Sequence, residues 1–192
     1  MLSTYMSTEY SSERNAATAS QTLAVLKAGA GLTILTVDAE GPTTEVSHGV
    51  IAALPAGTRV ALIDNPRQGL LGFLLGTCAA FGVPLPAEDH SIASLVAALR
   101  AFLDTHREQH PLLVVNEAQS APFYVLWQLL SLSATGSDWH RPLQVLLIGR
   151  PSLLDGLKNK EMAPVVARID AQFQLSQWVH HPQGGPVSAP MP

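Results

Sequence analysis

Two polar residues, Asn116 and Glu117, follow directly on a short apolar run and are the residues of this chain best placed to do chemistry. The run 112–115, Leu-Leu-Val-Val, contains no Gly or Pro and predicts a buried β-strand. In open α/β sheets, ligands bind beyond the carboxyl ends of the strands. There, an acidic residue can hold Mg²⁺ and its neighbour can orient a water molecule. Asn116 is poorly suited to the first task, because hard divalent cations prefer carboxylate oxygens.

Other residues that could do chemistry form weaker patterns. His106 and His110 lie one helical turn apart, a spacing that can bind zinc when a third ligand converges. However, Arg107 occupies the position where a His-Glu-x-x-His motif has its glutamate, so we interpret this segment as a solvated helix end. Cys78 lies in an apolar segment and is interpreted as a buried, inert thiol. We therefore predict no metal site.

Strand-like and helix-like segments alternate along the chain. Short runs rich in β-branched residues predict strands, and apolar residues at helical spacing predict helices. The predicted strands are 32–37, 59–64, 112–115, 143–148 and 169–175. The predicted helices are 12–28, 46–54, 70–81, 91–109, 122–132, 153–157 and 162–168, with Ser91 as an N-cap and Trp127 in the core. Such alternation predicts an α/β fold with a mostly parallel sheet and helices on both faces.

Composition narrows the class of protein. A chain of 192 residues with 47% hydrophobic and 14% charged residues predicts one domain with a substantial core. The formal net charge of −4 and the absence of a Lys/Arg cluster argue against nucleic-acid binding. We find no signal-peptide pattern and no run of about 18 apolar residues that could span a membrane, which predicts a soluble cytoplasmic protein. Residues 1–12 are predicted to be loose and flexible, and the Pro/Gly-rich tail 179–192 to be disordered.

Several local patterns, in this order of elements, resemble one known family. Residues 114–119, Val-Val-Asn-Glu-Ala-Gln, are similar to the second nucleotide motif of the secretion-ATPase family typified by general secretion pathway protein A, which reads apolar-apolar-Asp-Glu-Ala-Gln. Residues 144–153 resemble the family's following strand, 54–66 its second strand and turn, and 165–169 its Gln-Arg-Ile element. The resemblance covers about residues 15–178. It implies a three-layer P-loop NTPase fold of the RecA/AAA type, with a five-stranded sheet in the order 5-1-4-3-2.

The resemblance also requires a phosphate loop after the first strand, and there the chain departs from the family. The family's loop reads Thr-Gly-Glu-x-Gly-x-Gly-Lys-Thr-Thr, whereas residues 37–45 read Val-Asp-Ala-Glu-Gly-Pro-Thr-Thr-Glu. Thr43 stands in the lysine position, Thr44 follows it, and Gly41 is a single, shifted glycine. The lysine would bring positive charge to the phosphates, and the glycines would let backbone N–H groups surround them. Pro42 removes one N–H outright.

The family's site residues therefore map onto altered positions. The vestigial nucleotide-binding positions are Gly41, Thr43, Thr44 and Asn116. Glu117 matches the family's water-activating base, and we interpret it as a structural hydrogen-bond acceptor. Arg150 replaces a glutamine after the fourth strand; it could contact phosphate, and we favour a pairing with an acid such as Glu117. Arg168 matches an arginine that could face a neighbouring subunit's nucleotide, and we interpret it as a salt-bridge or interface residue.

Three functional hypotheses follow. The first is a degenerate ATPase-like domain over residues 13–178, a pseudo-ATPase that needs no cofactor and binds or scaffolds other proteins. The resemblance implies as its partners an active ATPase paralogue, or components of a secretion, surface-polymer or pilus assembly system, and implies that the chain could form oligomers. The second is a divergent ATPase that binds ATP and Mg²⁺ and slowly hydrolyses ATP, using Glu117 and a lysine or arginine from a neighbour. The third, a DNA-associated regulator like the transposition ATPases, is disfavoured by the net charge of −4.

Overall fold

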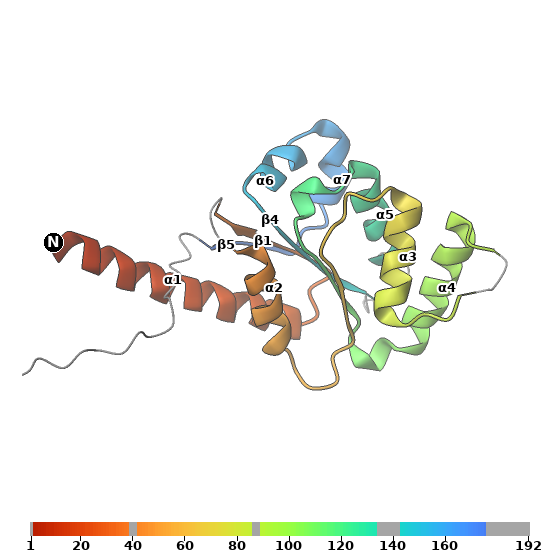
Figure 1. Cartoon of the computed structure of the whole chain (residues 1–192), viewed down its shortest axis with the longest axis horizontal. Helices are drawn as coiled ribbons and strands as arrows, with labels where there is room; N and C mark the ends of the chain where they lie inside the picture. Colours follow the sequence, from red (N-terminus) through yellow and green to blue (C-terminus); the bar gives the residue numbers. More distant parts are fainter. Residues whose placement is uncertain (1, 39–41, 86–88, 134–142, 176–192) are drawn as a thin grey trace, which may run out of the picture.

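Five parallel strands form the centre of the computed structural model, which describes the backbone of residues 2–38, 42–85, 89–133 and 143–175. The strands are β1 (Leu32–Val37), β2 (Val60–Ile63), β3 (Leu112–Val115), β4 (Gln144–Gly149) and β5 (Ala171–Leu175). They lie in the order β2-β3-β4-β1-β5. All four neighbouring pairs are parallel, so the carboxyl ends of the strands share one edge of the sheet (Figure 1). The predicted fold class and strand order are confirmed.

Helices cover both faces of this sheet. Figure 1 shows α1 (Leu2–Lys27) and α2 (Thr43–Ala52) on one side, and α3 (Leu70–Phe81), α4 (Ile92–Thr105) and α5 (Phe123–Ser133) on the other. The short helices α6 (Ser152–Leu157) and α7 (Ala163–Val166) pack on the same side as α5. Single 3₁₀ turns occur at Arg107–Gln109, Ala118–Ser120 and Lys160–Met162. The arrangement is a three-layer α/β/α fold.

Two hydrophobic layers hold the helices on the sheet. Successive strand residues point to opposite faces, so Ile34 packs with α3, α4 and α5, whereas Leu35 packs with α1 and α2. All six residues of β1 and all six of β4 are buried. Burial on both faces explains why these strands read as nearly continuous apolar runs.

The ends of several elements follow local sequence signals. The Ser91 side chain accepts a hydrogen bond from the Ser94 backbone N–H at 3.2 Å, which confirms the predicted N-cap of α4. Gly82 ends α3 in the left-handed conformation, with φ of 71°, that glycine adopts most easily. At the start of β1, the Asp170 carboxylate accepts hydrogen bonds from the backbone N–H groups of Gly31 and Leu32, at 2.7 and 3.0 Å.

Three sequence-based predictions need correction. The first helix begins at Leu2 and not at position 12, and no Gly or Pro interrupts this stretch. The helix after β1 begins at Thr43 and not at position 46, because the Val46 N–H already donates to the Pro42 carbonyl. Trp127 is 45% exposed and does not belong to the core. The buried stripe of α5 consists instead of Val125, Leu126, Leu129 and Leu132.

Other predictions are confirmed or lie outside the described residues. Cys78 is fully buried, and burial raises the pKa of its thiol, as expected for an inert cysteine. Among the described residues, no helix is long and apolar enough to cross a membrane. The tail 179–192 lies outside the described residues, and the domain limits 13–178 stay a prediction.

Candidate functional site

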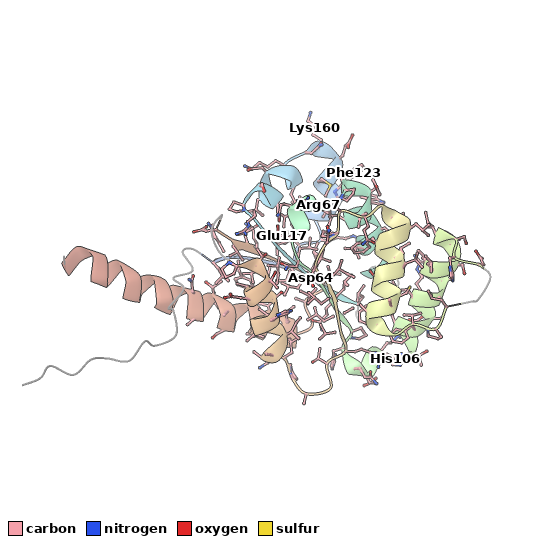
Figure 2. All side chains as sticks on the ribbon, in the orientation of Figure 1. Asp64, Arg67, His106, Glu117, Phe123 and Lys160 are labelled. Carbon is pink, nitrogen blue, oxygen red and sulfur yellow. The ribbon has the colours of Figure 1, made fainter. Side chains whose placement is uncertain are left out.

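The candidate site lies at the carboxyl edge of the sheet, where several strands end in polar residues. Asn116 and Glu117 follow β3, Asp64 follows β2 and Arg150 follows β4. The amino end of α2, with Thr43, approaches the same edge from the β1 side. Figure 2 shows Asp64 and Glu117 near this edge and His106 at the opposite end of the sheet.

Glu117 is held by hydrogen bonds from the protein itself. The Thr43 hydroxyl donates to Oε1 at 2.5 Å, and the Gln119 side-chain amide donates to Oε2 at 2.6 Å. Glu117 also has a φ of 51°, a left-handed conformation that costs a non-glycine residue about 1 kcal/mol. Each carboxylate oxygen therefore accepts one hydrogen bond from the chain, at a residue whose backbone conformation must be maintained by its surroundings.

Asn116 is 1% exposed and faces two oxygen atoms. Its Nδ2 donates to the Thr44 hydroxyl at 3.3 Å and to the Asp64 carboxylate at 3.4 Å. Because an ionised carboxylate only accepts hydrogen bonds, the amide nitrogen must be the atom that faces Asp64. Oδ1 is buried and has no hydrogen-bond partner among the described residues. An aspartate in this place would set two carboxylates against each other.

Gln119 links Glu117 to the end of β4. Its Oε1 accepts a hydrogen bond from the Arg150 backbone N–H at 3.0 Å while its amide nitrogen donates to Glu117. A Cβ atom at Gly149 would lie 2.6 Å from the Gln119 Oε1 and 3.3 Å from its backbone nitrogen, so a side chain there would force Gln119 to shift. The Arg150 guanidinium donates from Nη1 to the Asp38 carbonyl at 2.6 Å. Gln119 and Arg150 thus tie together the ends of β1, β3 and β4.

These contacts set the charge state of Glu117. The hydrogen bond from Thr43 holds the pKa of the Glu117 carboxyl below its ordinary value, against the opposite effect of burial. The hydrogen bond from Gln119 and the positive charges of Arg150 and Arg67 lower this pKa further. Glu117 is therefore ionised at neutral pH. The two arginines that act on it are Arg67, which follows β2, and Arg150, which follows β4.

Thr43 stands where the family has a lysine, and two of the three lysines of the chain have other contacts. Lys27 ends α1 and lines a cavity of about 420 Å³ between the amino end of the sheet and the turn 54–58. Lys158 forms an exposed ion pair with Asp155 at 2.7 Å. The cavity beside Lys27 is remote from Glu117, since Leu112 and Gln144, which begin β3 and β4, form part of its wall.

The structure brings most of the predicted site residues together. The residues that meet at the carboxyl edge are Thr43, Thr44, Asn116, Glu117 and Arg150. Arg168 is exposed and lies near the amino end of β5, two residues before Asp170, and so away from this cluster. Gly41 lies outside the described residues. Among those described, no group of three or more His, Cys, Asp or Glu side chains could hold a metal ion.

Sequence reasoning missed the roles of Asp64, Arg67 and Gln119. For Asp64 a signal existed: residues 60–64 repeat the pattern of four apolar residues and one polar residue found at 112–116. Because β2 and β3 are parallel neighbours, their carboxyl ends meet. Gln119 had no comparable signal, since its contact depends on the turn at Glu117 and on the missing side chain of Gly149.

The fold and this site define a protein of the P-loop NTPase class. A family model described as an AAA domain matches residues 20–157, and the chain belongs to this family. The predicted family resemblance is confirmed: the chain is 29% identical over 182 residues to general secretion pathway protein A of Aeromonas hydrophila. That alignment covers 89% of this chain and 31% of the relative, so the chain spans about a third of that protein's length.

Solved structures agree on the fold. The ORC2 protein of Aeropyrum pernix, in complexes with ADPNP and ADP, has a TM-score of 0.60 at 18% identity, covering 84% of this chain and 46% of the other. Cdc6p from Pyrobaculum aerophilum has a TM-score of 0.62 at 13% identity, covering 79% of this chain and 41% of the other. At such identities the likeness concerns the α/β/α fold alone.

Proposed function

We propose that this chain is a catalytically degenerate AAA-type domain that binds other proteins and does not turn over nucleotide. The observation that carries the proposal is the occupation of Glu117, whose two carboxylate oxygens accept hydrogen bonds from Thr43 and Gln119. A general base must reach the water that it activates, within hydrogen-bond distance. In this structure both carboxylate oxygens of Glu117 accept hydrogen bonds from side chains of the chain, which hold the carboxylate at Thr43 and Gln119.

The neighbouring positions support the same interpretation. Thr43 replaces the lysine that would neutralise terminal phosphates, and its hydroxyl donates a hydrogen bond to Glu117. Asn116 replaces a Mg²⁺-holding carboxylate, and its amide nitrogen donates to Thr44 and Asp64. Each altered residue thus has a structural hydrogen bond in place of its nucleotide contact. We infer that the site is retained because it ties the strand ends together.

The class of partner follows from the similarity to a protein whose name places it in a general secretion pathway. We propose protein components of a secretion or assembly system as partners, with an active ATPase among them.

One observation favours the alternative, a divergent ATPase. Arg67 and Arg150 both act on Glu117 with their positive charge, and two arginines could partly replace the missing lysine at a phosphate. In that case Glu117 would have to leave Thr43 and Gln119 when nucleotide and Mg²⁺ bind. The alternative therefore predicts turnover that depends on Glu117.

The two functions are separated by an ATP turnover assay on the full chain. The variants are Glu117→Gln, which removes the base, and Glu161→Gln, which removes an exposed glutamate remote from the site. We expect phosphate release at the background rate from the wild type and from both variants. Turnover in the wild type and the Glu161→Gln variant that is lost in Glu117→Gln would establish the ATPase alternative instead.

A further inference from the structure

Helix α5 carries an exposed aromatic surface that the candidate site does not use. Phe123, Tyr124 and Trp127 are 47, 46 and 45% exposed. Trp127 lies one helical turn after Phe123, and the rings of Phe123 and Tyr124 pack edge to face with their centroids 6.4 Å apart. Aromatic side chains in such numbers are typical of protein–protein contacts and not of a solvated helix face.

Two helices that contact α5 carry further exposed apolar side chains. Leu71 on α3 is 45% exposed, and Val166 on α7 is 44% exposed. Both helices contact α5, and the Tyr124 hydroxyl lies beside Gly69 at the start of α3. We call Leu71, Phe123, Tyr124, Trp127 and Val166 the α5 face. Of the large hydrophobic side chains that are exposed in the described part of the chain, Ile92 on α4 alone lies outside it.

The α5 face is also uncharged. No Asp, Glu, Lys or Arg occurs in α3, α5 or α7, although these helices lie in the outer layer of the fold (Figure 1). Outer helices of soluble domains normally present charged residues to the solvent. Charged residues occur instead just beyond the helices, as Arg67 before α3 and Lys160 before α7.

We propose that the α5 face is an isologous interface, through which two copies of this chain form a dimer with two-fold symmetry. In such an interface the same surface meets itself, and side chains near the axis face their own copies. An uncharged apolar face complements an identical face without like-charge repulsion, whereas a charged partner would lose solvation there without a counter-charge. A second copy can therefore meet the α5 face without burying an unpaired charge.

The area fits this assembly. Aromatic side chains bury about 150–250 Å² when fully covered, so exposed fractions near one half give the α5 face about 400 Å² of apolar surface. A stable dimer of standard size uses about 800 Å² on each partner, of which about 65% is apolar in homodimers. The α5 face supplies most of that apolar core. The neighbouring ends of α3 and α7 would provide the polar rim.

The proposal is independent of nucleotide binding, because the α5 face is formed by the outer surface of the helices and not by the strand ends. Glu117 and Thr43 keep their contacts in the dimer, and α1 and α2, on the other side of the sheet, stay uncovered (Figure 1). A dimer would therefore be expected with or without ATP.

The test is the mass of the full chain in solution, by light scattering after size exclusion. At about 100 µM, well above a micromolar Kd, we expect a mass twice that of the 20.4 kDa chain. Phe123→Glu and Leu71→Lys should each reduce it to the monomer mass. Ile92→Glu, a matched change at a residue that is 44% exposed on α4, should leave the dimer unchanged. Circular dichroism checks that each variant is folded. If Phe123→Glu does not fold, the mass of the Leu71→Lys variant tests the interface instead.

Mixing two variants tests the symmetry. Phe123→Glu and Phe123→Lys should each be monomeric alone and should recover the dimer mass when mixed, since the two-fold axis brings the opposite charges together. A monomeric wild type, a loss of the dimer in Ile92→Glu, or a mixture that stays monomeric would each overturn the proposed isologous interface.

Discussion

Replacing Asn116 by aspartate restores the residue type that the family has at this position, and we expect it to destabilise this chain. Asn116 is 1% exposed, and its amide nitrogen lies 3.4 Å from an Asp64 carboxylate oxygen. In the Asn116→Asp variant an oxygen would take the place of that donor. The hydrogen bonds to Asp64 and Thr44 would be lost or reversed, and a buried carboxylate at position 116 would lie beside the exposed carboxylate of Asp64.

The size of the effect follows from the distance. Two charges about 4 Å apart interact by roughly 4 kcal/mol at an effective dielectric constant near 20. The pair can avoid part of this repulsion by binding a proton, so we expect a loss of about 2–4 kcal/mol in the free energy of unfolding at pH 7. For a domain of this size that corresponds to a fall in Tm of roughly 5–15 °C.

The pH dependence identifies the cause. Repulsion raises the pKa of the introduced carboxyl in the folded state above its unfolded value of about 3.9. The penalty is therefore present at neutral pH and disappears as the pH falls through the folded-state pKa.

Asn116→Ala is the matched control, because it removes the same hydrogen bonds without adding charge. Urea unfolding at pH 7 and near pH 4.5 measures the free energy of unfolding of both variants relative to the wild type. The loss of stability should become smaller at the lower pH for the aspartate variant and not for the alanine variant. An aspartate variant as stable as the wild type at pH 7, or a deficit that alanine shares at both pH values, would refute the reasoning.

Further predictions concern the contacts that hold the site and one helix end. Thr43→Val removes the donor to Glu117 and should lower the free energy of unfolding at pH 7 by about 1–2 kcal/mol. Because the Glu117 pKa is depressed in the folded state, this stabilisation exists above the ordinary pKa of about 4.3 and is lost as the pH falls through the folded-state value. The gap between Thr43→Val and the wild type in urea unfolding should accordingly narrow in acid, and a gap independent of pH would contradict this role for Glu117. Gly149→Ala places a Cβ atom 2.6 Å from the Gln119 Oε1 and should destabilise the chain by about 1–3 kcal/mol; an unchanged Tm would show that Gln119 is not held there. Ser91→Ala removes the N-cap of α4 and should cost about 1 kcal/mol in urea unfolding, whereas no change would mean that the cap does not contribute.

The elements that sequence predicted well are those with strong local signals. The buried strand at 112–115 and the helix at 70–81 have the predicted limits, because apolar runs end there at polar residues or at glycine. The strand order could not be derived from hydrophobic periodicity, which specifies elements and not their neighbours, and it came from the family resemblance. Trp127 was placed wrongly because residues 123, 127 and 130 also follow a helical period, and only packing decides which stripe is buried.

The candidate site was predictable to the extent that it depends on strand ends. Asn116 and Glu117 follow β3 and meet Thr44 and Thr43, as the topology requires. The hydrogen bonds that occupy these residues could not be predicted. They depend on the left-handed turn at Glu117, which sequence does not indicate for a glutamate, and on side-chain orientations fixed by tertiary packing.

The central claim is that the strand-end cluster is retained for its architecture and not for nucleotide. Calorimetric titration of the full chain with ATP, with and without Mg²⁺, measures this most directly. We expect no saturable heat with ATP at about 1 mM, corresponding to a binding free energy weaker than about −4 kcal/mol. Saturable binding with a micromolar Kd that strengthens when Mg²⁺ is added would contradict the claim, because Thr43, Asn116 and Glu117 would then have to exchange their internal hydrogen bonds for contacts to the nucleotide.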